Sequence, residues 1–477
     1  MKKFIVLFID LEWYSLNLED FNDFKKTIDF NSSNTLITFQ TSDLVRELSL
    51  KIKNKLPTII DLESFDKHIS QEGKEFRNYN TWSALSFLKY YNIIDSDFKL
   101  TKKTIKIFLE NLALLYNKLL LKDDIEQKRF NNIEILINKI IHFRQLKGVR
   151  INLNIARKRC KELEKSIYNI KNTLQLQYNI FAPDYIETKK DYLSKNNYNL
   201  IQSLLYSFKI RRNSDQICNL FYELIRNQQD LDSLLYILSH WGGHQRTFPH
   251  YLGFGTITSR IILRQPALQN LRKSNRDIIL PDIGMKLLYI DYSQFEAGIL
   301  ASISEDIALI DLYNSDIYSD LAEKVLNNIE DRKEAKIIFY RYMYGDNSLN
   351  NNAKAYFEKF ETLNNFKNQI EDEALLSKKI GSNFGNYRLI FSEDINWALS
   401  HKIQSTASFI YKMALIRVYK EVKSASFLIP MHDGTVYQIE ESKYINSKYQ
   451  IEIIYKEEFK KVCPHIEPKL NCSEFFN

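Results

Sequence analysis

The sequence is poor in cysteine, glycine and proline, and it has no long apolar run. Its 477 residues include 4 cysteines, 12 glycines and 8 prolines. The cysteines lack the spacing of a metal site or a disulfide framework, which predicts a reducing, cytoplasmic setting; they are Cys160, Cys218, Cys463 and Cys472. No stretch approaches the roughly 20 apolar residues of a membrane helix, so no membrane partner is expected. Acidic residues follow the apolar N-terminal stretch at once, which predicts a first β-strand and not a signal peptide.

What is present is the composition of a globular protein with a slight basic excess. Hydrophobic residues make up 44% of the chain, and its length allows two or three domains. Lysine and arginine outnumber aspartate and glutamate by 66 to 59, a net charge of +7. This excess is compatible with a polyanionic partner, but it is also common among proteins that have none.

The chain divides into three stretches of different pattern. Residues 1–100 alternate strand-like and helix-like pieces, which predicts a small α/β domain. Residues 101–245 carry apolar positions at intervals typical of long amphipathic helices, whereas residues 246–477 mix strands, helices and loops. Near the start, Asp10 and Glu12 resemble the acidic pair that opens a proofreading exonuclease. Ordinary strand-end acids are the favoured interpretation, because a nuclease needs further carboxylates to bind two ions.

The segment 286–306 begins as a short apolar strand and continues as a helix. Leu287 to Ile290 are β-prone, and from Phe295 the apolar residues return at helical spacing. Asp291 stands where the strand ends, a position that suits a metal ligand held on a rigid element. The alternative is that Asp291 merely caps the helix.

Three other segments carry polar residues in patterns that suggest binding. A loop-rich stretch contains six cations, suited to a phosphate backbone: Arg246, Arg260, Arg264, Arg272, Lys273 and Arg276. A predicted helix at 331–347 presents two cations and then two aromatic rings, one every fourth residue: Arg332, Lys336, Tyr340 and Tyr344. Such a face can bind a phosphate tail and stack on a base, although an ordinary amphipathic helix is equally consistent. Finally, β-prone pieces flank Asp433 within 426–439, which indicates a hairpin with a carboxylate at its turn or a plain Asp-Gly turn.

Together these segments resemble, in the same order, four motifs of family A DNA polymerases, the bacterial DNA polymerase I family. The four are TSRIILRQPALQN at 258–270 (family TGRxSSxxPNLQN), DYSQFE at 291–296 (DYSQIE), RKEAKIIFYRYMYG at 332–345 (R-x3-K-x3-F/Y-x3-Y-G) and MHDG at 431–434 (VHDE). Two weaker matches are KGVRIN at 147–152 (RGVRID) and IQSTAS at 403–408 (MQGTAA). The resemblance covers about residues 140 to 440.

The resemblance implies an α+β right-hand polymerase with an antiparallel palm sheet, helical fingers and a helical thumb. On this basis residues 1–100 form a small α/β N-terminal domain, a candidate remnant of an exonuclease fold. Residues 101–245 form the helical thumb region, and residues 246–477 form the palm with the fingers inserted at about 305–395. The first domain is too short for the usual proofreading domain, so a polymerase without a full exonuclease is expected.

The resemblance also assigns the site. Asp291, Asp433 and the backbone carbonyl of Tyr292 are expected to bind two Mg²⁺ ions, for which Mn²⁺ can substitute, and Lys336 joins the aspartates in catalysis. The expected nucleotide-binding residues are Arg332, Lys336, Tyr340, Tyr344, Glu296 and Gln294. Glu296 would crowd a 2′-hydroxyl and so select deoxynucleotides. The expected primer-template contacts are Arg260, Gln269, Asn270, Gln404 and His432. Primer-template and dNTPs are therefore the implied partners, and protein partners stay open.

Two departures from the motifs keep other functions open. Gly434 replaces the glutamate of the last motif, and Ser259 replaces the middle glycine of TGR. Related single-subunit phage RNA polymerases also lack that glutamate, which allows an RNA or mixed-sugar polymerase, although Glu296 opposes it. A non-catalytic polymerase-like protein that binds nucleic acid is the third interpretation, and the retained Asp291 and Asp433 oppose it.

Overall fold

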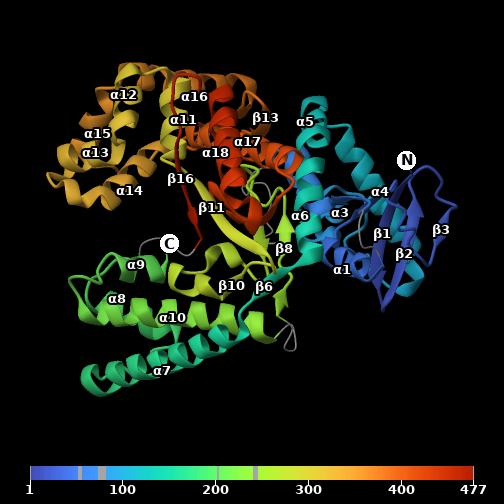
Figure 1. Cartoon of the computed structure of the whole chain (residues 1–477), viewed down its shortest axis with the longest axis horizontal. Helices are drawn as coiled ribbons and strands as arrows, with labels where there is room; N and C mark the ends of the chain where they lie inside the picture. Colours follow the sequence, from blue (N-terminus) through green and yellow to red (C-terminus); the bar gives the residue numbers. More distant parts are fainter. Residues whose placement is uncertain are drawn as a thin grey trace.

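The computed structural model describes residues 2–51, 56–72, 82–200, 203–239, 245–346 and 348–475. Figure 1 shows an N-terminal sheet on one side of the molecule and a second sheet, containing β11, at its centre. A long pair of helices, α7 and α10, extends below this central sheet, and a group of shorter helices lies above it. Among the described residues, no helix is both long and apolar enough to cross a bilayer.

The N-terminal unit is a five-stranded sheet covered by helices. Its strands, in sheet order, are β3 (Phe24–Lys25), β2 (Glu12–Asn17), β1 (Lys3–Ile9), β4 (Thr35–Thr38) and β5 (Thr58–Asp61). Its helices are α1 (Thr41–Lys51), α2 (Leu62–Ser70), α3 (Ala84–Tyr90) and α4 (Ile105–Leu120). Leu109 and Leu112 of α4 pack in one core with Ile5 and Leu7 of β1. The core of this unit thus extends past residue 100, where the sequence predicted the thumb region to begin, because helical periodicity does not reveal which layer a helix covers.

The next region is helical. It consists of α5 (Asp124–Arg129), a π turn η3 (Phe130–Glu134), α6 (Ile135–Lys147), α7 (Leu153–Tyr178), α8 (Ile186–Lys195), α9 (Leu204–Lys209) and α10 (Gln216–Ser239). The Asn152 side chain begins α7 by accepting a hydrogen bond from the Ile155 N–H at 3.1 Å. Leu174 of α7 and Phe221 of α10 share a small core, separate from the main one, which stabilises the extended helix pair.

The central sheet is a four-stranded antiparallel sheet. Its strands, in order, are β14 (Ala425–Met431), β15 (Gly434–Glu440), β11 (Met285–Ser293) and β16 (Lys469–Glu474). The helices packed with it are α11 (Phe295–Ser304), α17 (Ala398–Glu421) and α18 (Tyr444–Val462). Tyr292 ties the layers together, because its ring lies 4.2 Å from that of Phe295 and its hydroxyl donates to the Tyr455 carbonyl at 2.7 Å. The site residues are therefore mounted on a rigid, buried layer.

Short strands and helices connect these parts. Before β11 come β6 (Val149–Ile151), β7 (Arg246–Thr247), β8 (His250–Leu252), β9 (Ile262–Arg264), η4 (Leu268–Asn270), η5 (Lys273–Ile278) and β10 (Ile279–Leu280). After α11 come α12 (Ile307–Ser315), α13 (Ile317–Leu326), α14 (Arg332–Met343), α15 (Asn351–Glu358), α16 (Glu361–Ser377) and the hairpin β12 (Lys379–Ser382) and β13 (Gly385–Leu389). In Figure 1 the helices α12 to α15 gather on one side of the central sheet, beyond α11.

Candidate active site

Two aspartates far apart in sequence meet at one end of the central sheet. β11 pairs with β15 so that Asp291 faces Gly434, and the Tyr292 N–H donates to the Asp433 carbonyl at 3.4 Å. Asp433 thus stands next to the residue that faces Asp291 across the ladder. The helix α11 begins at Phe295 with Gln294 before it, so the alternative that Asp291 caps this helix is wrong.

The turn that carries Asp433 is a two-residue hairpin turn. Met431 of β14 pairs with Gly434 of β15, which leaves His432 and Asp433 as the turn residues. His432 has a φ of 58°, as tight hairpin turns require. Gly434 lies in the strand, so a plain Asp-Gly turn is also wrong, and His432 gains a backbone role that the sequence did not reveal.

Electrostatics at this end of the sheet favour a bound cation. Burial, and then the charge of Asp433, raise the pKa of Asp291 to about 7. Burial also raises the pKa of Asp433, although Arg260, His432 and Lys336 act in the opposite direction. A divalent ion offsets both effects, because it brings the charge that two close carboxylates need.

The donor set fits Mg²⁺, which takes one or two carboxylates and completes its shell with water and substrate oxygens. The described residues contain no group of three or more His, Cys, Asp and Glu side chains able to form a metal site. Asp291 and Asp433 would therefore hold metal together with the Tyr292 carbonyl and non-protein oxygens, and Mn²⁺ suits the same ligands.

Gly434 allows the close approach of the two strands here. A Cβ atom at Gly434 would lie 2.9 Å from both the Cα and the Cβ of Asp291 and would also overlap the Ile290 carbonyl oxygen. This is shorter than the roughly 3.5–4.0 Å of ordinary carbon contacts. Glycine replaces the family glutamate at this position, and the surrounding backbone leaves no room for a side chain.

Glu296, on the first turn of α11, is buried with one cationic partner. Its side chain is 2% exposed and forms an ion pair with the Arg260 guanidinium. Burial raises the pKa of Glu296 to about 7, and Arg260 opposes this shift. The structure therefore places the Arg260 guanidinium on the predicted sugar-selecting residue, with the charge of Asp433 nearby.

The predicted nucleotide-binding helix is α14. The rings of Tyr340 and Tyr344 stack with centroids 6.1 Å apart. Lys336 Nζ lies 5.7 Å from the Tyr340 centroid, and the charge of this lysine acts on both Asp291 and Asp433. The cation and the rings thus lie on one helix face turned toward the aspartates.

Asp316, which caps α13, and Tyr318 of α13 contact the same face of α14, and the sequence did not indicate either residue. Asp316 accepts from the Arg332 guanidinium at 2.5 and 3.2 Å, so Arg332 is already paired. The ring of Tyr318 lies under two cations, with centroid distances of 5.2 Å to Arg332 and 5.8 Å to Lys336. Neither residue lies in any of the four motifs, and the packing of α13 on α14 reveals them.

The remaining predicted residues divide into those at the site and those turned inward. Gln404 Nε2 donates to the Tyr344 hydroxyl at 2.7 Å. His432 and Asn270 are exposed. Gln269 donates to the Leu263 carbonyl at 3.0 Å and so supports its own loop. Gln294 accepts from the Ile317 N–H at 3.2 Å, which fixes the start of α13.

The acidic pair of the N-terminal unit is bound to lysines. Asp10 lies at the β1–β2 turn with Lys102 at 3.6 Å, and Glu12 pairs with Lys26 at 2.7 Å. Asp10 has a φ of 52°, so it belongs to the turn and not to the strand. The two carboxylates are thus neutralised separately.

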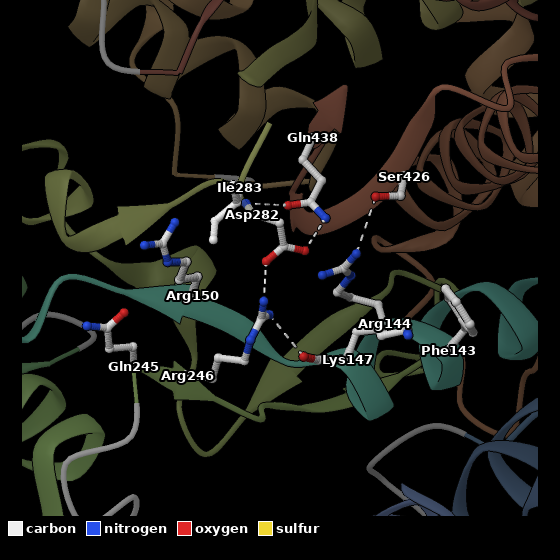
Figure 2. Close-up of a pocket in the computed structure, with 10 residues that line it drawn as sticks. All are labelled: Phe143, Arg144, Lys147, Arg150, Gln245, Arg246, Asp282, Ile283, Ser426 and Gln438. Carbon is white, nitrogen blue, oxygen red and sulfur yellow. Dashed lines mark hydrogen bonds and ion pairs between the residues drawn. The ribbon is translucent and has the colours of Figure 1, made fainter. Parts of the chain in front are cut away.

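A pocket of about 660 Å³ is lined in part by Asp282 and Ile283, which come just before β11, so it lies at the other end of this strand from Asp291. Figure 2 shows its lining residues. Its basic side chains are largely engaged with protein groups. Arg246 donates to Asp282. Arg144 donates to the Ser426 hydroxyl at 3.3 Å and to the Gly148 carbonyl at 3.0 Å. Arg144 thus joins α6 to β14, and Arg246 joins β7 to Asp282, which accepts from Gln438 of β15 at 2.8 Å. The pocket is therefore a junction between elements.

With this geometry established, comparison with known proteins identifies the family. The family model described as "DNA polymerase family A" matches residues 144–469, which is more than half of the chain. The chain belongs to DNA polymerase family A. The prediction from the four motifs is confirmed.

Relatives in the family are distant. DNA polymerase I of Caldicellulosiruptor bescii is 26% identical over 435 residues, covering 79% of this chain and 49% of the relative. DNA polymerase I of Borreliella burgdorferi is 25% identical over 430 residues, covering 76% and 44%. DNA polymerase theta of Caenorhabditis elegans is 25% identical over 217 residues, covering 39% and 13%. The chain thus spans about half, or less, of the length of these curated relatives.

A solved structure confirms the predicted α+β polymerase fold. The polymerase domain of Pol1 from M. smegmatis, in complex with DNA primer-template and dNTP, superposes with a TM-score of 0.74. The match covers 98% of this chain and 93% of that chain at 14% sequence identity. At this identity the match establishes the fold of this family A chain and not its substrates.

Proposed function

We propose that the chain is a template-directed DNA polymerase that adds deoxynucleotides to a primer 3′ end by two-metal nucleotidyl transfer. The observation that carries the proposal is the meeting of Asp291 and Asp433 across the β11–β15 ladder, with Lys336 of α14 turned toward them. Membership of family A supports the same reaction. The proposed substrates are primer-template and dNTPs.

Two Mg²⁺ ions at this site would favour deprotonation of the primer 3′-hydroxyl and stabilise the pyrophosphate leaving group. Asp291, Asp433 and the Tyr292 carbonyl would hold them. Lys336 supplies a positive charge to the triphosphate, close to the aspartates. Arg332, paired with Asp316, provides a second cation at the outer end of the same helix face.

The aromatic face of α14 would position the incoming base. Tyr340 and Tyr344 present stacked rings, and Gln404 fixes Tyr344 through its hydroxyl. Glu296 would lie under the sugar and exclude a 2′-hydroxyl. We assign primer-template contacts to Arg260, Asn270 and His432. Gln269 and Gln294, both turned inward, would act by holding their loops.

We also propose that the chain has no proofreading activity and works in a reducing, cytoplasmic setting. The lysines on Asp10 and Glu12 support the first point, since a nuclease site needs carboxylates that converge on metal. The thiols of the four cysteines support the second, because all four are free.

The alternative of an RNA or mixed-sugar polymerase rests on Gly434, which leaves no room for the family glutamate. The buried Glu296 opposes it, because a carboxylate beside the sugar excludes a 2′-hydroxyl. A non-catalytic role would give no reason for two close carboxylates whose burial is unfavourable without a metal ion.

Primer extension tests these functions together. DNA and RNA templates would each be offered with dNTPs or rNTPs, in Mg²⁺ and separately in Mn²⁺. We expect extension with dNTPs on DNA, and no shortening of a mismatched 3′ end when nucleotides are omitted. Equal use of both sugars would favour the second function, and binding without extension would favour the third.

A further inference from the structure

Ser259 adopts a backbone conformation that disfavours its side chain. Its φ is 66°, in the left-handed region, and it is 0% exposed. A Cβ atom is unfavourable in this conformation, which is why glycine is the usual residue there. The serine therefore needs compensating contacts, and its hydroxyl has them.

The hydroxyl of Ser259 lies in a buried ion cluster, formed with Arg129, Glu134 and Lys412. Lys412 Nζ donates to Ser259 Oγ and to both oxygens of Glu134, at 2.8 and 2.7 Å. Ser259 Oγ donates to Glu134 Oε1 at 3.2 Å and accepts from Arg129 Nη2 at 3.3 Å. One donated and two accepted hydrogen bonds use the full capacity of a hydroxyl.

A π turn builds this cluster. Arg129 and Glu134 are five residues apart and form an ion pair at 3.1 Å. In an α-helix such residues lie on different faces, but the π turn η3 (Phe130–Glu134) closes an i→i+5 hydrogen bond and brings them together. π turns are rare and frequent at functional sites.

Other segments hold the cluster in place. His68 of the N-terminal unit contacts Arg129 Nη1 through Nδ1 at 3.2 Å and Glu126 through Nε2 at 2.8 Å. The Tyr387 N–H of the β12–β13 hairpin donates to Glu126 at 3.0 Å. Buried charges fixed by several segments cannot adjust easily, so they specify one geometry.

The main chain of Ser259 is fixed as well, and its neighbour is a site residue. Ser408 Oγ of α17 donates to the Ser259 carbonyl at 2.7 Å. The next residue, Arg260, forms the ion pair with Glu296, whose Oε2 has no hydrogen-bond partner within the described residues. The orientation of Glu296 thus depends on where the loop places Arg260.

We propose that Ser259 is a positioning residue for sugar selection, acting through Arg260 on Glu296. The hydroxyl, anchored in the buried ion cluster, keeps the loop in the one conformation that sets the Arg260 guanidinium against Glu296. The inference rests on the proposed polymerase function for its effect on sugars, but not for the placement of the loop.

The experiment compares Ser259→Ala, which keeps the Cβ and loses the hydroxyl, with Ser259→Gly, which loses both. The matched control is Ser447→Ala on α18, a buried serine whose hydroxyl bonds to that of Ser424 at 2.6 Å. Single-turnover kcat/KM would be measured for one rNTP and its dNTP, beside the Kd for primer-template. Hydrogen exchange would be followed at the Arg260 amide, which donates to Thr256 Oγ1 at 3.1 Å.

We expect both Ser259 variants to raise the rNTP/dNTP ratio at least about fivefold. Primer-template Kd should rise by no more than a few-fold, because Arg260 is one of several proposed contacts to the primer-template. Exchange at Arg260 should become at least about tenfold faster, while Ser447→Ala changes neither quantity. A ratio within twofold of wild type in both variants, or an equal rise in the control, would overturn the proposal. If the wild type makes no DNA, the polymerase function fails, and the exchange at Arg260 alone decides whether Ser259 positions the loop.

Discussion

Placing a single methyl group at Gly434 should separate the two aspartates. In Gly434→Ala the new Cβ would begin 2.9 Å from two carbons of Asp291, so the strands must move apart by roughly 0.6–1.1 Å to reach ordinary contact. Overpacking of this kind costs about 1–3 kcal/mol of folding stability. A displacement of about 1 Å between catalytic groups can lower the rate about 100-fold.

The assay is single-nucleotide primer extension beside urea denaturation. The matched control is Gly284→Ala, because Gly284 has a φ of 76° and a Cβ atom there would point into open space, with no contact within 4 Å. That change is expected to cost about 1–2 kcal/mol through the left-handed backbone alone, and it lies at the start of β11, away from Asp291. We expect both variants to lose stability and only Gly434→Ala to lose extension. A Gly434→Ala protein that extends primers within threefold of wild type would refute the argument that this glycine sets the carboxylate geometry.

Three further predictions concern single side chains. Tyr340→Phe should lower the use of dideoxynucleotides relative to dNTPs by about 10- to 100-fold, since a tyrosine hydroxyl can replace a missing 3′-hydroxyl worth about 1–3 kcal/mol; identical ratios would mean that Tyr340 does not contact the sugar. Glu296→Ala should raise rNTP use at least about tenfold, or about 1.4 kcal/mol of lost discrimination, in competitive extension; an unchanged ratio would remove Glu296 from sugar selection. Burial lowers the pKa of His142 to about 3 and that of His401 to about 4, so only the unfolded chain gains these protons as the pH falls below about 6.5. The contribution of these two histidines to stability should therefore fall between pH 6.5 and 4, by about 2 kcal/mol each at pH 5. The raised pKa values of Asp291 and Glu296 act in the opposite direction over this range, so the test is the difference between two proteins. Between pH 7 and 5, urea denaturation should show His401→Gln losing about 2 kcal/mol less stability than wild type, and the same pH dependence in both proteins would contradict this.

The parts of the site that lie in one continuous segment could be predicted from the sequence. The strand that carries Asp291, the hairpin at Asp433 and the helix with Lys336 are local patterns, and each element forms. The strand does not end at Asp291 as expected, because β11 continues two residues further, to Ser293. Local patterns carry turn and period information, so they identify elements well. The sequence did not show that His432 and Asp433 are the turn residues, because Asp433-Gly434 is itself a strong turn signal.

Contacts between distant segments could not be predicted. The Lys412–Glu134 pair joins residues 278 positions apart, and nothing near either residue signals the other. β16 completes the central sheet beside β11, although its six residues alternate only weakly. The packing of α4 on the N-terminal sheet is a further case, because an amphipathic helix shows that one face is buried but not against what.

We propose that Asp291 and Asp433 together hold the metal ions of nucleotidyl transfer, and removal of either negative charge examines this proposal. Single-turnover primer extension with Mg²⁺ would compare wild type with Asp291→Asn and Asp433→Asn, which keep the shape of the side chain and remove its charge. We expect loss of extension in each variant, with primer-template Kd within a few-fold of wild type, because phosphate contacts elsewhere supply the binding. Extension at a near wild-type rate by either variant would contradict it.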